Sequence, residues 1–234
     1  MDSTPKPWPA LLRARWLGRC DFSETLQLQQ HIREQLLLQQ ELPTLLLAEH
    51  PPTLTLGRRA NPIDILWSPH ELSAAGINVC ETPRGGEVTL HAPGQLVVYP
   101  IMYVGRHIRA FITCLANAAC QLLAELGISQ ATFNQANPGI WVGDYKLGSI
   151  GLHIRRGVSI QGLSVNLDID PQLFSAFIPC GMHHGRLENA RSFAHILIST
   201  EQAAKRYASL FAQTLATQLQ WDIDSDAENA SILG

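Results

Sequence analysis

The alternation of apolar and polar positions along the chain predicts many short strands separated by turns. Two of them, Thr44 to Glu49 and Thr53 to Leu56, are split by His50-Pro51-Pro52, where two prolines exclude a helix and remove backbone donors. Other runs rich in β-branched and aromatic residues are predicted to be strands as well, namely Ile77 to Glu81, Val88 to His91, Gln95 to Val104, Gly139 to Val142, Tyr145 to Ile154 and Val158 to Leu167.

Fewer segments have the spacing of helices. The Gln-rich stretch Gln27 to Gln40 carries an apolar residue at every fourth position, and Ser23 is its candidate cap. The sequence Ser68-Pro69-His70-Glu71 is a capping box that predicts a short helix ending at Gly76. We expect further helices over Ile108 to Leu126, Pro171 to Phe177 and Thr200 to Leu219. Clustered strands with few helices predict one α+β domain, residues 1–234, built on a mixed sheet.

Composition narrows the functional class. The chain has 234 residues, of which 46% are hydrophobic, which predicts a folded chain with a sizeable core. A net charge of -3 does not favour nucleic acid, and no run of residues is long enough to predict a membrane span. Five cysteines without a CxxC pair and the lack of a secretory signal predict a reducing compartment, so we expect a cytoplasmic protein whose acidic tail begins at about Asp222.

Two glycine-bearing segments hold residues that a core does not need. In Arg84-Gly85-Gly86, adjacent glycines allow the backbone to approach a ligand and the arginine adds a cation with five donors. An ordinary hairpin turn is the alternative. In Gly143 to Gly151, strand alternation predicts that Lys146 shares a face with Gly148 and Ile150. That lysine is either enclosed in a cleft or solvated on an edge strand.

A third segment, Ile178 to Gly185, places Cys180 between a proline and a glycine. Irregular loops often carry reactive groups, and a nearby cation such as Lys146 would favour the nucleophilic thiolate. Cys180 with His183 and His184 is an alternative metal site, although a fourth ligand at motif spacing is missing. The remaining cysteines are typical of core positions.

Five collinear motifs resemble those of the lipoyl(octanoyl) transferases. The most specific are RGGEVTLHAPGQ at Arg84 to Gln95 and KLGSIG at Lys146 to Gly151. The others are QGLSVN at Gln161 to Asn166, the FSAFIPCG segment that ends at Gly181, and EHPPTLTLG at Glu49 to Gly57. Four positions depart from the family pattern, namely Leu54, Leu90, Ala92 and Gln161, and the last of these replaces a titratable histidine.

The resemblance implies a mixed sheet with flanking helices, as in the catalytic domain of the biotin and lipoate protein ligases. It implies that Cys180 is the acyl-accepting nucleophile and that Lys146 lowers the pKa of its thiol. It implies neither a metal nor a cofactor. The substrate site would be lined by three groups of residues: Arg84, Gly85, Gly86, Glu87, Val88, Thr89, Leu90 and His91; Ser149, Ile150 and Gly151; and Gly162, Leu163 and Ser164.

The implied reaction transfers octanoate from octanoyl-acyl carrier protein to a lysine of lipoyl domains. The implied acceptors are the lipoyl domains of 2-oxoacid dehydrogenases and the glycine cleavage H protein, with no nucleic acid or membrane partner. Because such partners are acidic, a basic docking patch is expected among Arg58, Arg59, Arg106, Arg109, Arg155 and Arg156. Two alternatives remain open, an ATP-dependent lipoate or biotin ligase and a non-catalytic acyl-binding protein.

Overall fold

The computed structural model describes residues 8–179, 186–194 and 198–222. Its α-helices are α1 (Phe22–Leu37), α2 (Pro69–Ala74), α3 (Ile108–Glu125) and α4 (Thr200–Leu215). Its strands are β1 (Leu11–Arg19), β2 (Thr44–Glu49), β3 (Thr53–Leu56), β4 (Asn78–Glu81), β5 (Val88–His91), β6 (Gln95–Ile101), β7 (Thr132–Asn134), β8 (Gly139–Val142), β9 (Tyr145–Arg155), β10 (Val158–Asn166), β11 (Arg186–Leu187) and β12 (Gln218–Trp221).

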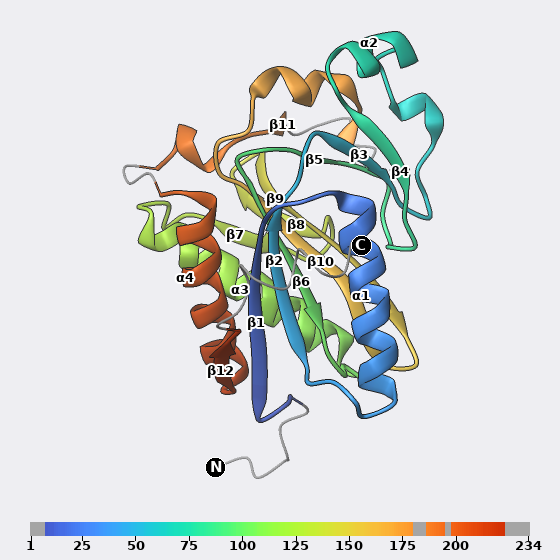
Figure 1. The fold of residues 1–234 in the computed structure, drawn as a ribbon. Coiled ribbons are helices and arrows are strands. Elements are labelled where there is room, and N and C mark those ends of the chain that lie inside the picture. The colour runs from blue at the N-terminus through green and yellow to red at the C-terminus, as the bar shows by residue number, and fades with distance from the viewer. Residues whose placement is uncertain (1–7, 180–185, 195–197, 223–234) are drawn as a thin grey trace.

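Most of the strands form one large mixed sheet. Its order is β12-β1-β2-β6-β10-β9-β8-β7, with β11 paired to β9 off this path. The strands β12, β1 and β2 are parallel, whereas β2, β6, β10, β9, β8 and β7 pair antiparallel in turn. Helix α1 lies on one face of the sheet, and α3 and α4 lie on the other (Figure 1).

The side chains of β2 explain why both faces are covered. Leu45 and Leu47 pack into the core beneath α3 and α4, whereas Leu46 and Ala48 pack with Ile32 of α1. Alternate residues of a strand point to opposite faces, so an all-apolar strand requires a layer on each side. This arrangement makes a three-layer domain with the large sheet in the middle.

A smaller sheet lies over one end of the large one (Figure 1). It has the order β4-β3-β5, in which β3 runs parallel to β4 and antiparallel to β5. Its own apolar cluster includes Leu54, Leu90, Ile169 and Phe177. Because β3 separates β4 from β5, the loop at Arg84 is not a hairpin turn between paired strands, and that alternative is wrong.

The strand predictions for β2, β3, β5 and β8 match the observed bounds, and the predicted capping box at Ser68 is present on α2. Other local predictions were wrong. Asp21, rather than Ser23, caps α1 by accepting from two backbone N–H groups. Helix α4 ends at Leu215, and part of its predicted C-terminal extension is β12. Strand β1 was not predicted from the sequence.

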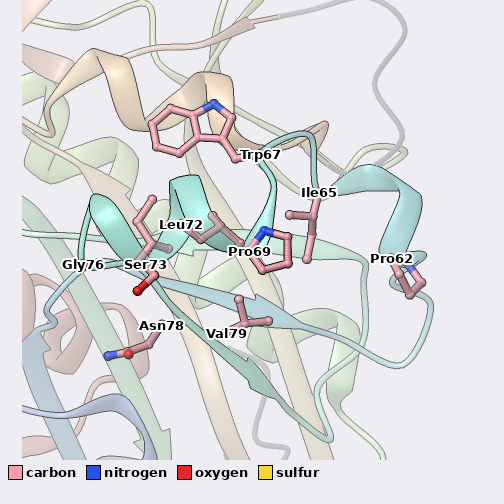
Figure 2. Close-up of a pocket in the computed structure, with 10 residues that line it drawn as sticks. Pro62, Ile65, Trp67, Pro69, Leu72, Ser73, Gly76, Asn78 and Val79 are labelled. Carbon is pink, nitrogen blue, oxygen red and sulfur yellow. The ribbon is translucent and has the colours of Figure 1, made fainter.

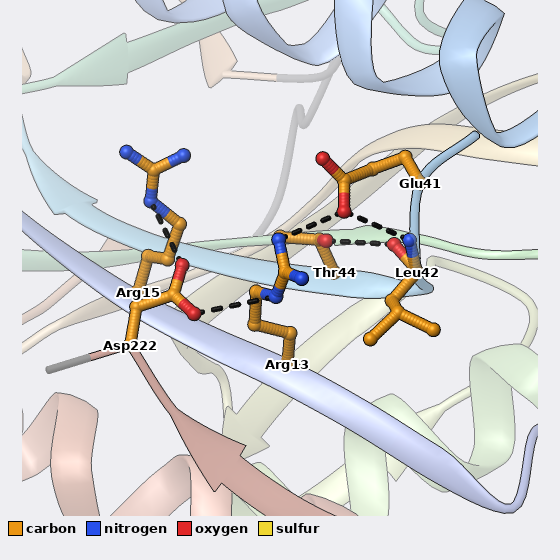
Figure 3. A network of polar contacts seen from close by, with 6 residues as sticks. All are labelled: Arg13, Arg15, Glu41, Leu42, Thr44 and Asp222. Carbon is orange, nitrogen blue, oxygen red and sulfur yellow. Dashed lines mark hydrogen bonds and ion pairs between the residues drawn. The ribbon is translucent and has the colours of Figure 1, made fainter.

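The outer edge of the large sheet carries a polar network (Figure 3). Asp222, just after β12, pairs with Arg13 at 3.2 Å and Arg15 at 3.5 Å on β1, and Arg13 also reaches Glu41 at 2.8 Å. These ion pairs connect β12 to its parallel neighbour β1 on the solvent side. Within residues 8–179, 186–194 and 198–222, none of the helices has the length and apolar content that crossing a membrane requires.

Candidate active site

A narrow cavity of about 40 Å³ lies where the loop before β5 meets strands β9 and β10. Its volume is about that of one or two water molecules. The residues that line it come from both sheets and are Arg84, Gly85, Gly86, Thr89, His91, Val97, Tyr99, Pro138, Lys146, Ser149, Ile150, Gly151, Gln161, Gly162, Leu163 and Ser164.

Lys146 is enclosed in this cavity, with only 1% of its surface exposed. Its ammonium group lies 5.4 Å from the centre of the Trp141 ring, which favours a cation. Gly139 is needed beside it, because a Cβ atom there would come within 2.5 Å of Lys146 Cε. The alternative of a solvated lysine on an edge strand is therefore wrong.

A bulge in β9 sets the direction of that lysine. Opposite Ile140 and Trp141 of β8, the register of β9 skips Leu147. Leu147 thereby joins the apolar core, against which Ile150 also packs, while Lys146 lines the cavity. The expectation that Lys146 shares a face with Gly148 and Ile150 holds only in part, because Lys146 and Ile150 both line the cavity but Gly148 does not.

Arg84 is 5% exposed and holds the small sheet to the cavity wall. Its guanidinium donates to the backbone oxygen of Thr55 at 2.6 Å and to that of Glu87 at 2.9 Å. It also donates to the Thr55 hydroxyl at 2.8 Å and to Gly85 O at 3.0 Å. A Cβ atom on Gly151 of β9 would make a tight contact here, 3.1 Å from Arg84 Cδ.

Two buried histidines lie side by side at the inner end of the site. The rings of His50 and His91 meet edge to face at 5.8 Å, and Phe22 of α1 contacts both. His50 bonds the Cys20 carbonyl and the Tyr99 hydroxyl, each at 2.7 Å. Burial lowers the pKa of His50 to about 4, and burial together with His50 lowers the pKa of His91 to about 3. Sequence reasoning identified His91 but not its partners, since these come from distant segments.

The structure brings most of the predicted substrate-site residues together around one cavity. Glu87, Val88 and Leu90 are the exceptions, because they do not line it. Val88 and Leu90 instead point into the apolar cluster of the small sheet and a neighbouring small hollow. Leu90 was expected beside the acyl chain; it alternates with His91 along β5 and lines the small hollow that Pro179 also lines.

Cys180, His183 and His184 lie outside the described residues. The residues on either side of this segment are described, however, and both border the site. Pro179 lines the small hollow that shares Thr89 and Ser149 with the main cavity. On the other side, β11 pairs with β9 so that Leu187 stands opposite Lys146.

Four other cysteines are described, and three have thiols that resist ionisation. Burial raises the pKa of Cys20, Cys114 and Cys120 above the ordinary value of 9.0. Because the thiolate is the nucleophilic form, these three are suited to packing rather than to chemistry.

A larger hollow of about 570 Å³ lies against the small sheet and α2 (Figure 2). Pro62, Ile65, Trp67 and Leu72 give it an apolar wall, and none of the residues that line it is titratable. It contains none of the predicted site residues. Its size therefore does not make it the better candidate for covalent chemistry.

Comparisons with known proteins show what the chain is similar to. Residues 21–212 match the lipoyl protein ligase A/B catalytic domain. The octanoyltransferase of Alkaliphilus metalliredigens is 38% identical over 71% of this chain and 78% of its own length. The mitochondrial octanoyl-[acyl-carrier-protein]:protein N-octanoyltransferase of Danio rerio is 37% identical over 74% of this chain and 78% of its own.

The fold has relatives among solved structures as well. The bi-partite lipoate protein ligase of Thermoplasma acidophilum is similar with a TM-score of 0.70, covering 95% of this chain and 92% of that one. At 16% identity this likeness concerns the fold alone. It confirms the predicted α+β architecture of a mixed sheet with flanking helices.

Proposed function

Because the chain belongs to the lipoyl protein ligase A/B catalytic domain family and, within it, to the octanoyltransferases, which are acyltransferases, we propose how it carries out octanoyl transfer. The donor is octanoyl-acyl carrier protein, and the acceptor is a lysine of a lipoyl domain. The octanoyl group passes through a thioester on Cys180. This reaction is the first step in building the lipoate cofactor on its protein.

The observation that carries the proposal is the enclosed Lys146 in a cavity that adjoins the small hollow lined by Pro179 and Leu187, on either side of the Cys180 segment. A buried lysine is rare unless it has a partner or a task. A cation next to a thiol favours the thiolate, and the Lys146 nitrogen lies over the Trp141 ring at 5.4 Å. Lys146 is thereby suited to activating a cysteine nucleophile.

The reaction has two steps. The Cys180 thiolate attacks the carrier thioester, so that a new S–C bond forms, the S–C bond to the carrier breaks and the carrier leaves as its thiolate. The lysine amine of the acceptor then attacks the Cys180 thioester, so that an amide forms and the Cys180 thiol is restored. The energy of the donor thioester drives both steps, and ATP is not required.

The acyl chain requires more room than the cavity of about 40 Å³ provides. Ile150 and Leu163 give the cavity its apolar part, and these side chains must move apart as the chain enters. Burying about seven alkyl carbons at roughly 0.8 kcal/mol each offers on the order of 5 kcal/mol for this opening and for binding.

A basic cluster beside the cavity supports docking of an acidic carrier. Arg58 and Arg155 are exposed, and the backbone N–H of Arg58 donates to Arg84 O at 3.0 Å. Burial and the charges of Arg33, Arg58 and Arg155 lower the pKa of His153, which places these groups close together. Arg58 and Arg155 belong to the predicted docking patch, whereas Arg33 is buried.

The cellular location of the protein and the identity of the acceptor domains are part of the same proposal. The cytoplasm was expected from composition, and it stays a prediction because some octanoyltransferases of this family, such as that of Danio rerio, are mitochondrial. The 2-oxoacid dehydrogenases and the glycine cleavage H protein remain the expected owners of the acceptor domains.

The test is intact-mass spectrometry after mixing the protein with octanoyl-acyl carrier protein in the absence of ATP. Wild type should gain one octanoyl group, and Cys180→Ala should gain none. Cys114→Ala is the matched control, because it removes a thiol from α3 and should leave the gain intact.

A gain that persists in Cys180→Ala would refute the acyl-enzyme. The same measurement with free octanoate and ATP distinguishes the ligase alternative, which predicts modification of a lipoyl domain only when ATP is present. A non-catalytic acyl-binding protein predicts no covalent gain under either condition.

A further inference from the structure

A chain of buried amides lies behind His91. Gln95 Oε1 is 2.7 Å from His91 Nδ1, and Gln95 Nε2 is 2.8 Å from Asn166 Oδ1. The His91 ring is also stacked on Phe22, with centroids 5.4 Å apart and an angle of 14° between planes. These contacts fix both the position and the rotation of the imidazole.

The same contacts determine which ring nitrogen carries the hydrogen. Gln95 Nε2 donates to the backbone oxygen of Leu90 at 3.1 Å, and a carbonyl oxygen can only accept. The amide orientation of Gln95 is therefore fixed, with Oε1 turned toward His91. Since Oε1 is also an acceptor, His91 Nδ1 must be the donor and Nε2 must hold a lone pair.

The surroundings keep that lone pair available. Burial, His50 and Arg84 hold the pKa of His91 at about 3, so the ring stays neutral at neutral pH. His50 is fixed in the same tautomer, because its Nδ1 donates to Cys20 O and its Nε2 accepts from the Tyr99 hydroxyl. His91 lines the cavity, and among the described residues its Nε2 has no hydrogen-bond partner.

The cavity thus contains cationic hydrogen-bond donors and, at His91, a hydrogen-bond acceptor. Arg84 can only donate hydrogen bonds, and Lys146 as an ammonium can only donate as well. His91 is the imidazole with a free lone pair among the described residues that line the cavity. An incoming amine brings N–H groups that require an acceptor, whereas the octanoyl chain brings none.

We propose that His91 Nε2 accepts a hydrogen bond from the attacking lysine amine and so directs the amine lone pair toward the acyl carbon. This inference rests on the proposed function. The N–C bond forms as the C–S bond breaks, and the proton lost by nitrogen ends on the departing sulfur. His91 remains neutral throughout, so it is a hydrogen-bond acceptor for the nucleophile rather than the final proton acceptor.

The experiment separates the two half-reactions. His91→Phe preserves a ring against Phe22 and removes the acceptor. With octanoyl-acyl carrier protein, this variant should form the acyl-enzyme at close to the wild-type rate. Single-turnover transfer from the isolated acyl-enzyme to a lipoyl domain should then fall about ten- to a hundredfold, as expected for losing one hydrogen bond at a buried site.

Two further variants sharpen this result. His91→Gln can present its Oε1 near the position of Nε2 and should recover most of the transfer. His70→Phe changes an exposed imidazole on α2 that does not line the cavity, and should leave both half-reactions near wild type. A normal transfer rate in His91→Phe, or an equal loss in both half-reactions, would overturn the inference.

The tautomer can be measured without any variant. Long-range ¹H–¹⁵N spectra of the wild-type protein should show His91 protonated at Nδ1 and bare at Nε2 at pH 7. A proton on Nε2 would overturn the proposal even if His91→Phe failed to fold. Failure of wild type to form an acyl-enzyme would instead refute the proposed function, so the two failures are distinguishable.

Discussion

The two faces of the large sheet are built from the same strands but from different chemistry. Beneath α3 and α4, β10 contributes Val165 to a core of apolar side chains, and Leu163 belongs both to that core and to the cavity lining. On the face toward α1 and the small sheet, the same strand contributes Gln161, Gly162 and Ser164, which line the cavity.

One face of the sheet therefore stabilises the fold, and the other provides the polar residues of the site. The α3/α4 face gains its stability from buried apolar area. The cavity face buries His91, Arg84 and Lys146, whose desolvation costs free energy unless hydrogen bonds compensate it. Polar groups on that face are thus maintained at a cost in stability, which is typical of functional sites.

Gly162 tests whether small residues on the cavity face leave room for a ligand or for the fold. A Cβ atom at this position would overlap the carbonyl oxygen of Val98 in β6. We therefore expect Gly162→Ala to lower the free energy of unfolding by more than about 3 kcal/mol, beyond the usual range for overpacking.

The matched control is Gly85→Ala, another predicted substrate residue, where the nearest atom, Leu152 O, is 3.8 Å away. It should melt within a few degrees of wild type. Thermal unfolding followed by circular dichroism measures both. A stable but inactive Gly162→Ala would show that the glycine serves the substrate instead.

Neighbouring residues on β9 provide the next test, because Lys146 lines the cavity and Leu147 packs into the α3/α4 core. Lys146→Met keeps the volume and removes the charge, so octanoyl transfer should fall at least about a hundredfold. Leu147→Met should cost less than about 1.5 kcal/mol of stability and leave the transfer rate unchanged. Transfer assays and urea unfolding on both variants check this, and equal activity in the two would contradict the role of Lys146.

Local patterns allowed much of the fold to be predicted. The local sequence patterns of Thr44–Glu49 and Gly139–Val142 are sufficient to predict strands, and the bounds of both were predicted correctly. Strand β1 was missed although Leu12 and Ala14 alternate with Arg13 and Arg15, because the charged positions obscured the pattern. Strand β12 was missed because its residues continue the apolar stripe of α4.

The site was less accessible to local patterns. The family resemblance predicted which segments line the cavity, but the bulge at Leu147, which depends on pairing with β8, was not predicted. Likewise, the tautomer of His91 depends on Gln95 and Asn166, and the latter lies 71 positions further along the chain than Gln95. Contacts at such separation arise only from the complete fold.

Glu49 connects the region of the small sheet with the start of α4 through hydrogen bonds. Its carboxylate accepts from the Gly94 backbone at 3.0 Å, next to the small sheet, and from the Thr200 hydroxyl at 2.8 Å, at the start of α4. Burial raises the pKa of Glu49, but these bonds and that from Arg19 outweigh it and hold the pKa below its ordinary value of 4.5.

A depressed pKa in the folded state means that the charged carboxylate stabilises the fold above about pH 4.5 and loses this effect as the pH falls through the folded value. Glu49→Gln should therefore lower the free energy of unfolding at pH 7 by about 1 to 3 kcal/mol.

Asp222→Asn removes a carboxylate that also has two partners, Arg13 and Arg15, but at the open edge of the sheet, so it should cost less than about 1 kcal/mol. Urea unfolding at pH 7 and pH 3 measures both, and the difference between Glu49→Gln and wild type should shrink at the lower pH. Equal costs for the two variants at pH 7 would mean that burial at the junction adds nothing to what a surface ion pair provides.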